Sequence, residues 1–188
     1  MLSWHVDYWD YLGWKDPFGS KAHTERQKRY VKALGLRGLV TPQLFAGNAP
    51  VAARALKEAV EKGAEAPALF ALEVQAKLEE TAVRASAKLT RAGDAATAGK
   101  GAGVFALLVR RSATTAPDAG ENRGATLVEH FVVLAAGAVT PLEQALEKGV
   151  QAEFPGPAGA AAADLLVAFL VEEGESMKTL ECAWAPVR

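Results

Sequence analysis

Two polar side chains near the start of the sequence, His5 and Asp7, have the types and spacing that could do chemistry. They stand two apart in a segment where apolar and polar residues alternate, which is the pattern of a β-strand. In a strand such a pair leaves the same face, with backbone positions about 7 Å apart. A carboxylate that orients an imidazole is the arrangement of general bases and of metal-bound histidines. The alternative is a polar pair satisfied within the fold beside Trp9.

The sequence offers no partner that would complete a reactive site around this pair. We identify no nucleophile and no third ligand, so we predict no catalytic residue, no cofactor-binding residue, no cofactor and no metal-ligand set. A weaker hypothesis keeps a metal site at His5 and Asp7, because imidazole and carboxylate are both zinc ligands.

The same opening stretch is rich in aromatic side chains. Its first eighteen residues hold three of the four tryptophans and two of the three tyrosines of the chain. Trp and Tyr are favoured anchors in protein interfaces. A contact surface is therefore a second interpretation of this stretch.

The chain contains a single cysteine, Cys182. No disulfide within the chain, no Cys-x-x-Cys motif and no multi-cysteine zinc site can form from these residues. A catalytic thiol needs a neighbouring base or helix dipole to lower its pKa, and the sequence suggests neither beside Cys182. We expect a small apolar core residue there.

Charge and hydropathy exclude two classes of partner. The 188 residues carry a net charge of −1, so the whole molecule has no electrostatic attraction to nucleic acid or anionic membrane. Residues 15–37 hold seven Lys or Arg against two acidic residues, but a solvated helix face explains such a run more often than phosphate binding does. No run approaches the roughly twenty apolar residues of a membrane helix, and no signal peptide opens the chain. We predict no nucleic-acid partner and no membrane span.

The segments that must position His5 and Asp7 alternate between strand and helix patterns. The predicted elements are a strand over Leu2–Tyr8, a helix over Lys21–Leu34, a β-like run over Leu36–Ala46 and a helix over Pro50–Lys62. Ser20 suits the first helix as N-cap and Gly35 ends it. Pro42 breaks the β-like run, and the low frequency of cis X-Pro bonds predicts a trans peptide there. This β-α-β-α order is typical of an α/β layer.

From residue 65 onward the pattern changes to strands and polar loops. The predicted strands are Leu72–Leu78 paired with Val83–Leu89, Val104–Arg110, an apolar run within Ala125–Ala135, and a closing hairpin of Leu165–Val171 with Met177–Trp184. The predicted loops are Arg91–Gly103, Ser112–Gly124 and Phe154–Ala163. A short helix is expected after the capping-box pattern Thr140–Glu143. Five or six such strands favour a β-sandwich or a small barrel.

Three stretches of the sequence together resemble a known family. They are HVDYWD with LGWKDPF in residues 5–18, TERQ with Tyr30 and TPQ in residues 24–43, and GEN with Gly124 and Thr126-Leu127. In order and spacing they resemble the signatures of the secreted, thioredoxin-like proteins of domain-of-unknown-function family 1223. The resemblance covers most of the chain and is weakest over residues 64–119 and after Leu134.

The resemblance implies an α+β protein: an incomplete thioredoxin-like α/β layer in residues 1–64 followed by a β-sandwich in residues 65–188. It makes Pro42 a candidate cis-proline and places the protein in the periplasm or outside the cell. The family begins with a strand and a Cys-x-x-Cys-Pro segment ahead of the His-Val-Asp strand, and neither is in this sequence. The chain therefore resembles a member entered at its second strand, through an internal start codon or a shortened gene.

The leading hypothesis for function is a thioredoxin-like member of this family that is not redox-active in this form. His5, Asp7, Trp9 and Pro42 are its expected cleft positions. The alternative is a binding or assembly module that uses the aromatic opening stretch. A weaker alternative is a thiol–disulfide oxidoreductase whose true start lies upstream. Because a sheet that lacks a strand exposes an unpaired edge, we also expect self-association there.

Overall fold

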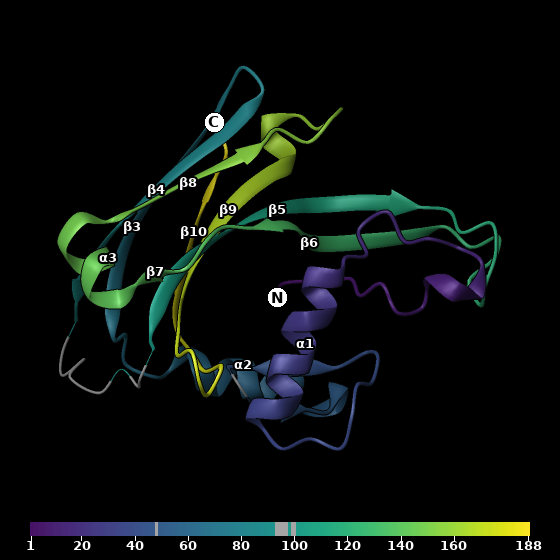
Figure 1. Ribbon diagram of the computed structural model, residues 1–188, viewed down its shortest axis with the longest axis horizontal. Coiled ribbons are helices and arrows are strands. Elements are labelled where there is room, and N and C mark those ends of the chain that lie inside the picture. Colours follow the sequence, from purple (N-terminus) through teal and green to yellow (C-terminus); the bar gives the residue numbers. More distant parts are fainter. Residues whose placement is uncertain (48, 93–97, 99–100) are drawn as a thin grey trace.

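The computed structural model describes residues 1–47, 49–92, 98 and 101–188. This part of the chain is an α+β fold with three α-helices and three antiparallel sheets (Figure 1). The helices are α1 (Lys21–Ala33), α2 (Leu56–Ala64) and α3 (Leu142–Lys148). The strands are β1 (Leu44–Ala46), β2 (Ala49–Val51), β3 (Phe70–Glu79), β4 (Ala82–Arg91), β5 (Gly103–Thr115), β6 (Leu127–Ala136), β7 (Thr140–Pro141), β8 (Val150–Pro155), β9 (Leu165–Glu172) and β10 (Thr179–Pro186). The 3-10 helices within the described residues are Asp10–Leu12, Ala53–Ala55 and Ala162–Asp164.

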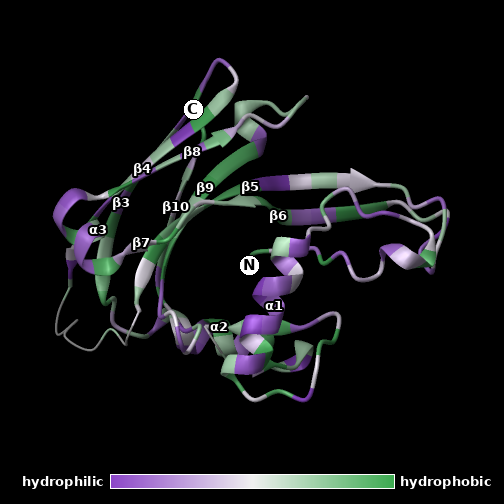
Figure 2. Cartoon of the chain, in the orientation of Figure 1, coloured by the Kyte–Doolittle hydropathy of each residue, from purple (hydrophilic) through white to green (hydrophobic). Residues whose placement is uncertain are grey.

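Two larger sheets enclose the main apolar core. One has the strand order β3-β4-β8, and the other has the order β10-β9-β5-β6 with β7 beside β5. Alternate residues of β4 are buried, so one face of that strand points into the core and the other meets water. Strand β9 is buried at every position and is hydrophobic along most of its length (Figure 2). Phe70, Phe154 and Phe169 belong to this core, at 3% exposure or less.

The start of the chain packs on the face of the five-stranded sheet that points away from the main core. We refer to residues 1–18 as the opening segment. Leu2 and Trp4 pack against a second buried cluster on that face. The buried members of the cluster are Phe105, Leu107, Val109, Val133, Leu166, Ala168 and Leu170. Ser3 forms a parallel bridge with Val132 at the edge of β6. Leu2 and Trp4 therefore lie against β5, β6 and β9, on the face of the sheet opposite the main core.

The strand predicted for Leu2–Tyr8 is wrong in extent. Only Ser3 pairs, donating its N–H to the Phe131 carbonyl and accepting from the Val133 N–H, each at 2.9 Å. After Ser3 the backbone turns toward α1 instead. The His5 carbonyl accepts from the Ser20 N–H at 3.2 Å, so the hydrogen bonds that would have extended the strand go to the start of the helix.

Helix α1 begins and ends where the sequence predicts. The Ser20 side chain accepts from the His23 N–H, and Gly35 follows the helix with a positive φ of 60°. The Gly35 N–H reaches the Lys32 carbonyl and the Leu36 N–H reaches the Val31 carbonyl, which is the Schellman arrangement. The limits of α1 are therefore set by Ser20 at its start and Gly35 after its end.

The segment after α1 differs from the prediction. The β-like run becomes irregular up to Gln43, and Leu44–Ala46 then pairs with Ala49–Val51 as a short hairpin. Because Pro50 takes a strand position opposite Phe45, the second helix begins only at Leu56. The Thr41–Pro42 peptide is cis, so the expectation from X-Pro frequency is wrong and the one from the family resemblance is confirmed.

In residues 65–188 both predicted hairpins are confirmed, as β3–β4 and β9–β10. Helix α3 is also present, but Pro141 precedes it without a side-chain cap, so the capping box is wrong. The loop prediction for Ser112–Gly124 fails at its start because β5 continues to Thr115 with alternate residues buried. The predicted linker from Phe154 fails because Val150–Pro155 pairs with β4. Most of the predicted Arg91–Gly103 loop lies outside the described residues.

Candidate functional site

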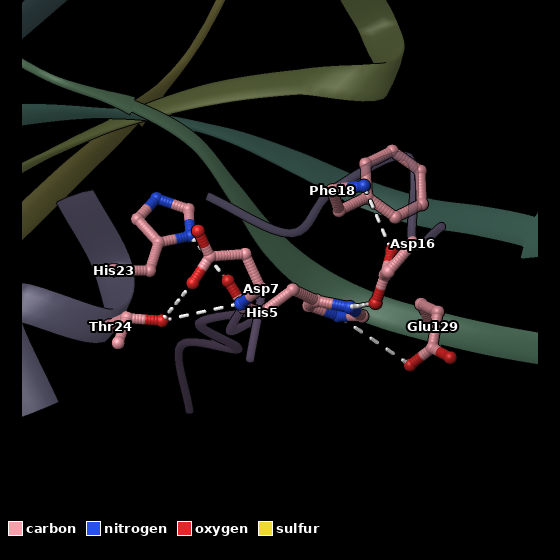
Figure 3. Close-up of polar contacts among 7 residues, drawn as sticks. All are labelled: His5, Asp7, Asp16, Phe18, His23, Thr24 and Glu129. Carbon is pink, nitrogen blue, oxygen red and sulfur yellow. Dashed lines mark hydrogen bonds and ion pairs between the residues drawn. The ribbon is translucent and has the colours of Figure 1, made fainter. Parts of the chain in front are cut away.

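The carboxylate that orients His5 is Asp16, not Asp7. His5 Nδ1 lies 2.6 Å from Asp16 Oδ2, and the ring is close to buried, with 12% of its side chain exposed (Figure 3). The pairing of His5 with Asp7 that the strand spacing allows is therefore not formed. The spacing of two assumed a regular strand, and the backbone leaves strand geometry after Ser3.

A tight turn brings Asp16 to His5. The Phe18 N–H donates to Asp16 Oδ1 at 2.8 Å, and the Gly19 N–H donates to the Asp16 carbonyl at 3.0 Å. A Cβ on Gly19 would lie 3.1 Å from the Val6 carbonyl oxygen, so a larger residue would push the turn away from the opening segment. Burial alone would raise the pKa of Asp16, but the His5 hydrogen bond and the Phe18 N–H outweigh it and lower that pKa.

A second carboxylate faces the other side of the imidazole. Glu129, on β6, places Oε2 3.8 Å from His5 Nε2. Burial disfavours the charged imidazolium, but the hydrogen bond to Asp16 and the charges of Asp16 and Glu129 outweigh it and raise the pKa of His5. The site therefore favours a protonated His5 between two carboxylates, which is a poor arrangement for a general base.

Asp7 is used for structure. The Thr24 hydroxyl donates to Asp7 Oδ1 at 2.5 Å and accepts from the Asp7 N–H at 3.2 Å (Figure 3). Thr24 is 5% exposed on α1, so the pair ties the opening segment to that helix. No group of three or more His, Cys, Asp or Glu suited to a metal ion occurs among the described residues, and the structure gives no support to a metal site at His5 and Asp7.

His23 completes the contact between the opening segment and α1. Its Nδ1 lies 3.0 Å from the His5 carbonyl, where a protonated nitrogen donates. The Trp4 ring meets the His23 ring edge-on at 5.1 Å between centroids. Burial lowers the pKa of His23, which keeps this second imidazole neutral while His5 holds the charge.

Trp9 and Pro42 come together through Thr41. The Trp9 indole N–H donates to Thr41 Oγ1 at 2.9 Å. Gln27 of α1 supports the same loop, since its amide donates to the Val40 carbonyl and to Gln43 Oε1, each at 2.8 Å. Of the four predicted cleft positions, Trp9 is therefore bonded to the residue before Pro42, while His5 and Asp7 engage separate partners.

A shallow groove of about 380 Å³ lies beside Pro42. Its lining comes from the loop after α1 and from the β1–β2 hairpin, and is mostly apolar. The lining residues are Leu36, Arg37, Gly38, Val40, Pro42, Gln43, Leu44, Pro50, Val51 and Ala52. Val40 is 57% exposed at its rim.

The sequence-based reasoning missed a buried ion pair between Arg26 and Glu172. Arg26 Nη1 donates to Glu172 Oε1 at 3.2 Å, and its Nη2 contacts Glu172 Oε2. The guanidinium also lies over the rings of Trp4, Tyr30 and Phe105, at 4.7 to 5.2 Å. Burial raises the pKa of Tyr30, and the negative charge of Glu172 also raises it. The positive charge of Arg26 opposes this shift without cancelling it. The predicted hairpin ends its first strand at Val171 and so leaves Glu172 outside it, and a separation of 146 residues gives no local signal for the pair.

Cys182 is exposed on β10, so the predicted core position is wrong. It pairs across the strands with Leu170, at the outer strand of the five-stranded sheet. Desolvation by its neighbours, together with the Glu181 carboxylate, raises the pKa of the thiol. A raised pKa keeps the sulfur protonated and unreactive.

Membrane insertion has no support from the helices. Among the described residues, none of the helices combines the length and the apolar character needed to cross a bilayer.

The fold matches solved structures with little sequence identity. Protein AGR_C_4864 from Agrobacterium tumefaciens aligns with a TM-score of 0.63 and 24% identity, over 97% of this chain and 78% of that chain. HBP35 of Porphyromonas gingivalis aligns with a TM-score of 0.60 and 15% identity, over 88% of this chain and 58% of that chain. A domain of the outer membrane lipoprotein Omp28 from Porphyromonas gingivalis aligns over 64% of this chain and 89% of that chain. Its TM-score is only 0.38, at 10% identity, which is too low to indicate a shared fold.

Sequence comparison identifies the family. No curated protein matches the sequence. Residues 1–172 match the family described as "Protein of unknown function (DUF1223)", so the match covers residues 1–64 and most of residues 65–188. The chain therefore belongs to the DUF1223 family of proteins of unknown function.

Proposed function

We propose that this protein is a polypeptide-binding module. In this proposal residues 1–64 are a thioredoxin-like layer and residues 65–188 are a β-sandwich that supports it. The contact surface consists of Trp9, Tyr11 and the Thr41–Pro42 loop, and we refer to it as the aromatic surface. The family resemblance supports a periplasmic or secreted location.

One observation carries the proposal: Trp9 is exposed and yet held in place. Its indole is 45% exposed while its N–H is bonded to Thr41. The neighbouring rings of Tyr8 and Tyr11 lie 5.5 and 6.1 Å away between centroids, and Tyr11 is 76% exposed. A partly exposed ring whose polar atom is already hydrogen-bonded suits an interface anchor, because little conformational entropy is lost on binding.

The groove beside Pro42 supports an extended polypeptide as the partner. Its apolar lining suits alternate apolar side chains, and Arg37 at its wall is the one charged lining residue. Strands β1 and β2 pair only with each other among the described strands, so each presents an edge that an added strand could extend.

The cysteine content supports binding without dithiol chemistry. Thiol–disulfide exchange needs an attacking thiolate and a second sulfur close in space. Cys182 is the single cysteine of these 188 residues. It lies on β10, while the aromatic surface lies on the opening segment and the loop after α1.

Replacing Trp9 with alanine should weaken binding of an extended polypeptide by about tenfold or more, as the loss of an aromatic anchor does. The probe is fluorescently labelled, reduced and carboxymethylated lactalbumin, and the measurement is fluorescence anisotropy. Trp184→Ala is the matched control, because Trp184 is similarly exposed, at 58%, but lies on β10. Equal affinities of the Trp9→Ala variant and the unaltered protein, or no binding by the unaltered protein, would refute the proposal.

A further inference from the structure

The His5 imidazole lies between two carboxylates from different parts of the fold. Asp16 belongs to the turn before α1 and contacts Nδ1 at 2.6 Å, while Glu129 belongs to β6 and lies 3.8 Å from Nε2. Each ring nitrogen thus faces its own anionic partner (Figure 3). The ring connects the opening segment, on which Trp9 lies, to the edge strand of the larger sheet.

The remaining neighbours of the ring carry no competing negative charge. His23 on α1 forms its hydrogen bond with the His5 carbonyl, and its burial favours the neutral form. The Phe18 ring meets the imidazole edge-on at 5.6 Å between centroids. Asp16, Glu129 and His23 are therefore the titratable groups that face His5 from the turn, from β6 and from α1.

We propose that His5 is a proton-operated clamp that fastens the opening segment to β6 and so controls how firmly the aromatic surface is held. This regulatory role rests on the proposed binding function, but the clamp itself can be tested without any ligand.

The two protonation states differ mainly at Glu129. The imidazolium donates from Nδ1 to Asp16 and from Nε2 toward Glu129. On loss of a proton, the close bond to Asp16 retains the remaining N–H, and Nε2 presents a lone pair to the Glu129 carboxylate. The hydrogen bond to Asp16 persists, while the interaction between Nε2 and the Glu129 carboxylate changes from attraction to repulsion.

The pH range of the clamp follows from the direction of the two pKa shifts. Because the pKa of His5 is raised, its stabilising contribution is complete below the unfolded value of about 6.5 and is lost as pH rises through the folded value. Because the pKa of Asp16 is lowered, its contribution is present above the unfolded value of about 3.9 and is lost as pH falls through the folded value. The clamp is closed between about pH 4 and pH 6.5 and opens on the alkaline side.

Hydrogen exchange at the bridge to β6 tests the clamp directly. The Ser3 and Val133 amides form that bridge, and their protection factors should fall by roughly threefold or more between about pH 6 and pH 8.5. Glu129→Gln should abolish this dependence, because an amide can accept from a protonated Nε2 and donate to a neutral one. His5→Gln should also abolish it. His130→Gln is the matched control, since His130 is exposed on the same strand, and it should retain the dependence.

Two readouts separate failure of the clamp from failure of the proposed function. Protection that does not change with pH in the unaltered protein, or a dependence that persists in Glu129→Gln, overturns the clamp whatever the probe does. If the clamp regulates the aromatic surface, affinity for carboxymethylated lactalbumin should also change by roughly twofold or more between the two pH values, and only in proteins with His5 and Glu129 intact. A pH-dependent bridge with unchanged affinity would contradict the regulatory role alone.

Discussion

Replacing Arg26 with methionine should lower the free energy of unfolding by about 3–5 kcal/mol. Glu172 is 5% exposed, and this change leaves its carboxylate buried without a cationic partner. The loss is large because the buried carboxylate has lost its hydration and no longer has an opposite charge to compensate for it. Methionine keeps an unbranched apolar side chain but removes the guanidinium, and with it the contacts to the rings of Trp4 and Tyr30. Equilibrium unfolding in urea measures the free energy of unfolding of the variant and of the unaltered protein.

The double variant Arg26→Met with Glu172→Leu should recover most of that loss, since removal of both charges of a buried pair is often close to neutral. Lys28→Met is the matched control. Lys28 pairs with Glu25 on the same helix, and both side chains are 52% exposed, so this variant should lose no more than about 1 kcal/mol. A double variant as unstable as Arg26→Met would show that the guanidinium acts through its ring contacts instead.

Replacing Gly149 with alanine should cost about 3 kcal/mol or more. Gly149 ends α3 with φ 70° and ψ −173°, a region that residues with a Cβ rarely adopt. A Cβ there would lie 2.7 Å from the Ala87 carbonyl oxygen in β4, and this backbone atom is fixed by the pairing of β4 with β8. Strain and steric overlap therefore add, and the junction of α3 with β8 must move.

Gly124→Ala separates these two contributions. Gly124 also has a positive φ, of 78°, but a Cβ there would meet nothing within 4 Å. It should cost only the conformational strain, about 1 kcal/mol. Thermal unfolding of both variants measures the difference, and equal losses would show that the contact with β4 contributes nothing.

The sequence predicts best the elements whose limits depend on neighbouring residues. Ser20 and Gly35 define α1 because each satisfies backbone groups at its own end of the helix. The β3–β4 and β9–β10 hairpins follow from alternation on a half-buried sheet and from a nearly continuous apolar run. Strand β8 could not be predicted, because its pairing with β4 joins segments far apart in the chain.

The candidate site was predicted only in part for the same reason. The sequence offers Asp7 as the carboxylate beside His5, but the partner is Asp16, which reaches His5 through a turn that the strand pattern does not contain. Glu129 lies within Ala125–Ala135, where the sequence predicts only an apolar run. Its contact with His5 depends on how the opening segment crosses β6. Trp9 and Pro42 were chosen separately from composition and from family resemblance, and the Thr41 hydroxyl that joins them has no signal in the sequence.

The central claim, that the aromatic surface binds an extended polypeptide, is tested most directly by the indole N–H resonances of the four tryptophans. Single substitutions assign each resonance, and carboxymethylated lactalbumin is then titrated into the labelled protein. Trp9 should shift or broaden with added probe, while the resonances of Trp4, which is partly buried and contacts His23 of α1, and of Trp184 on β10 should stay in place. An unmoved Trp9 resonance at saturating probe, or a shift confined to Trp184, would contradict the account.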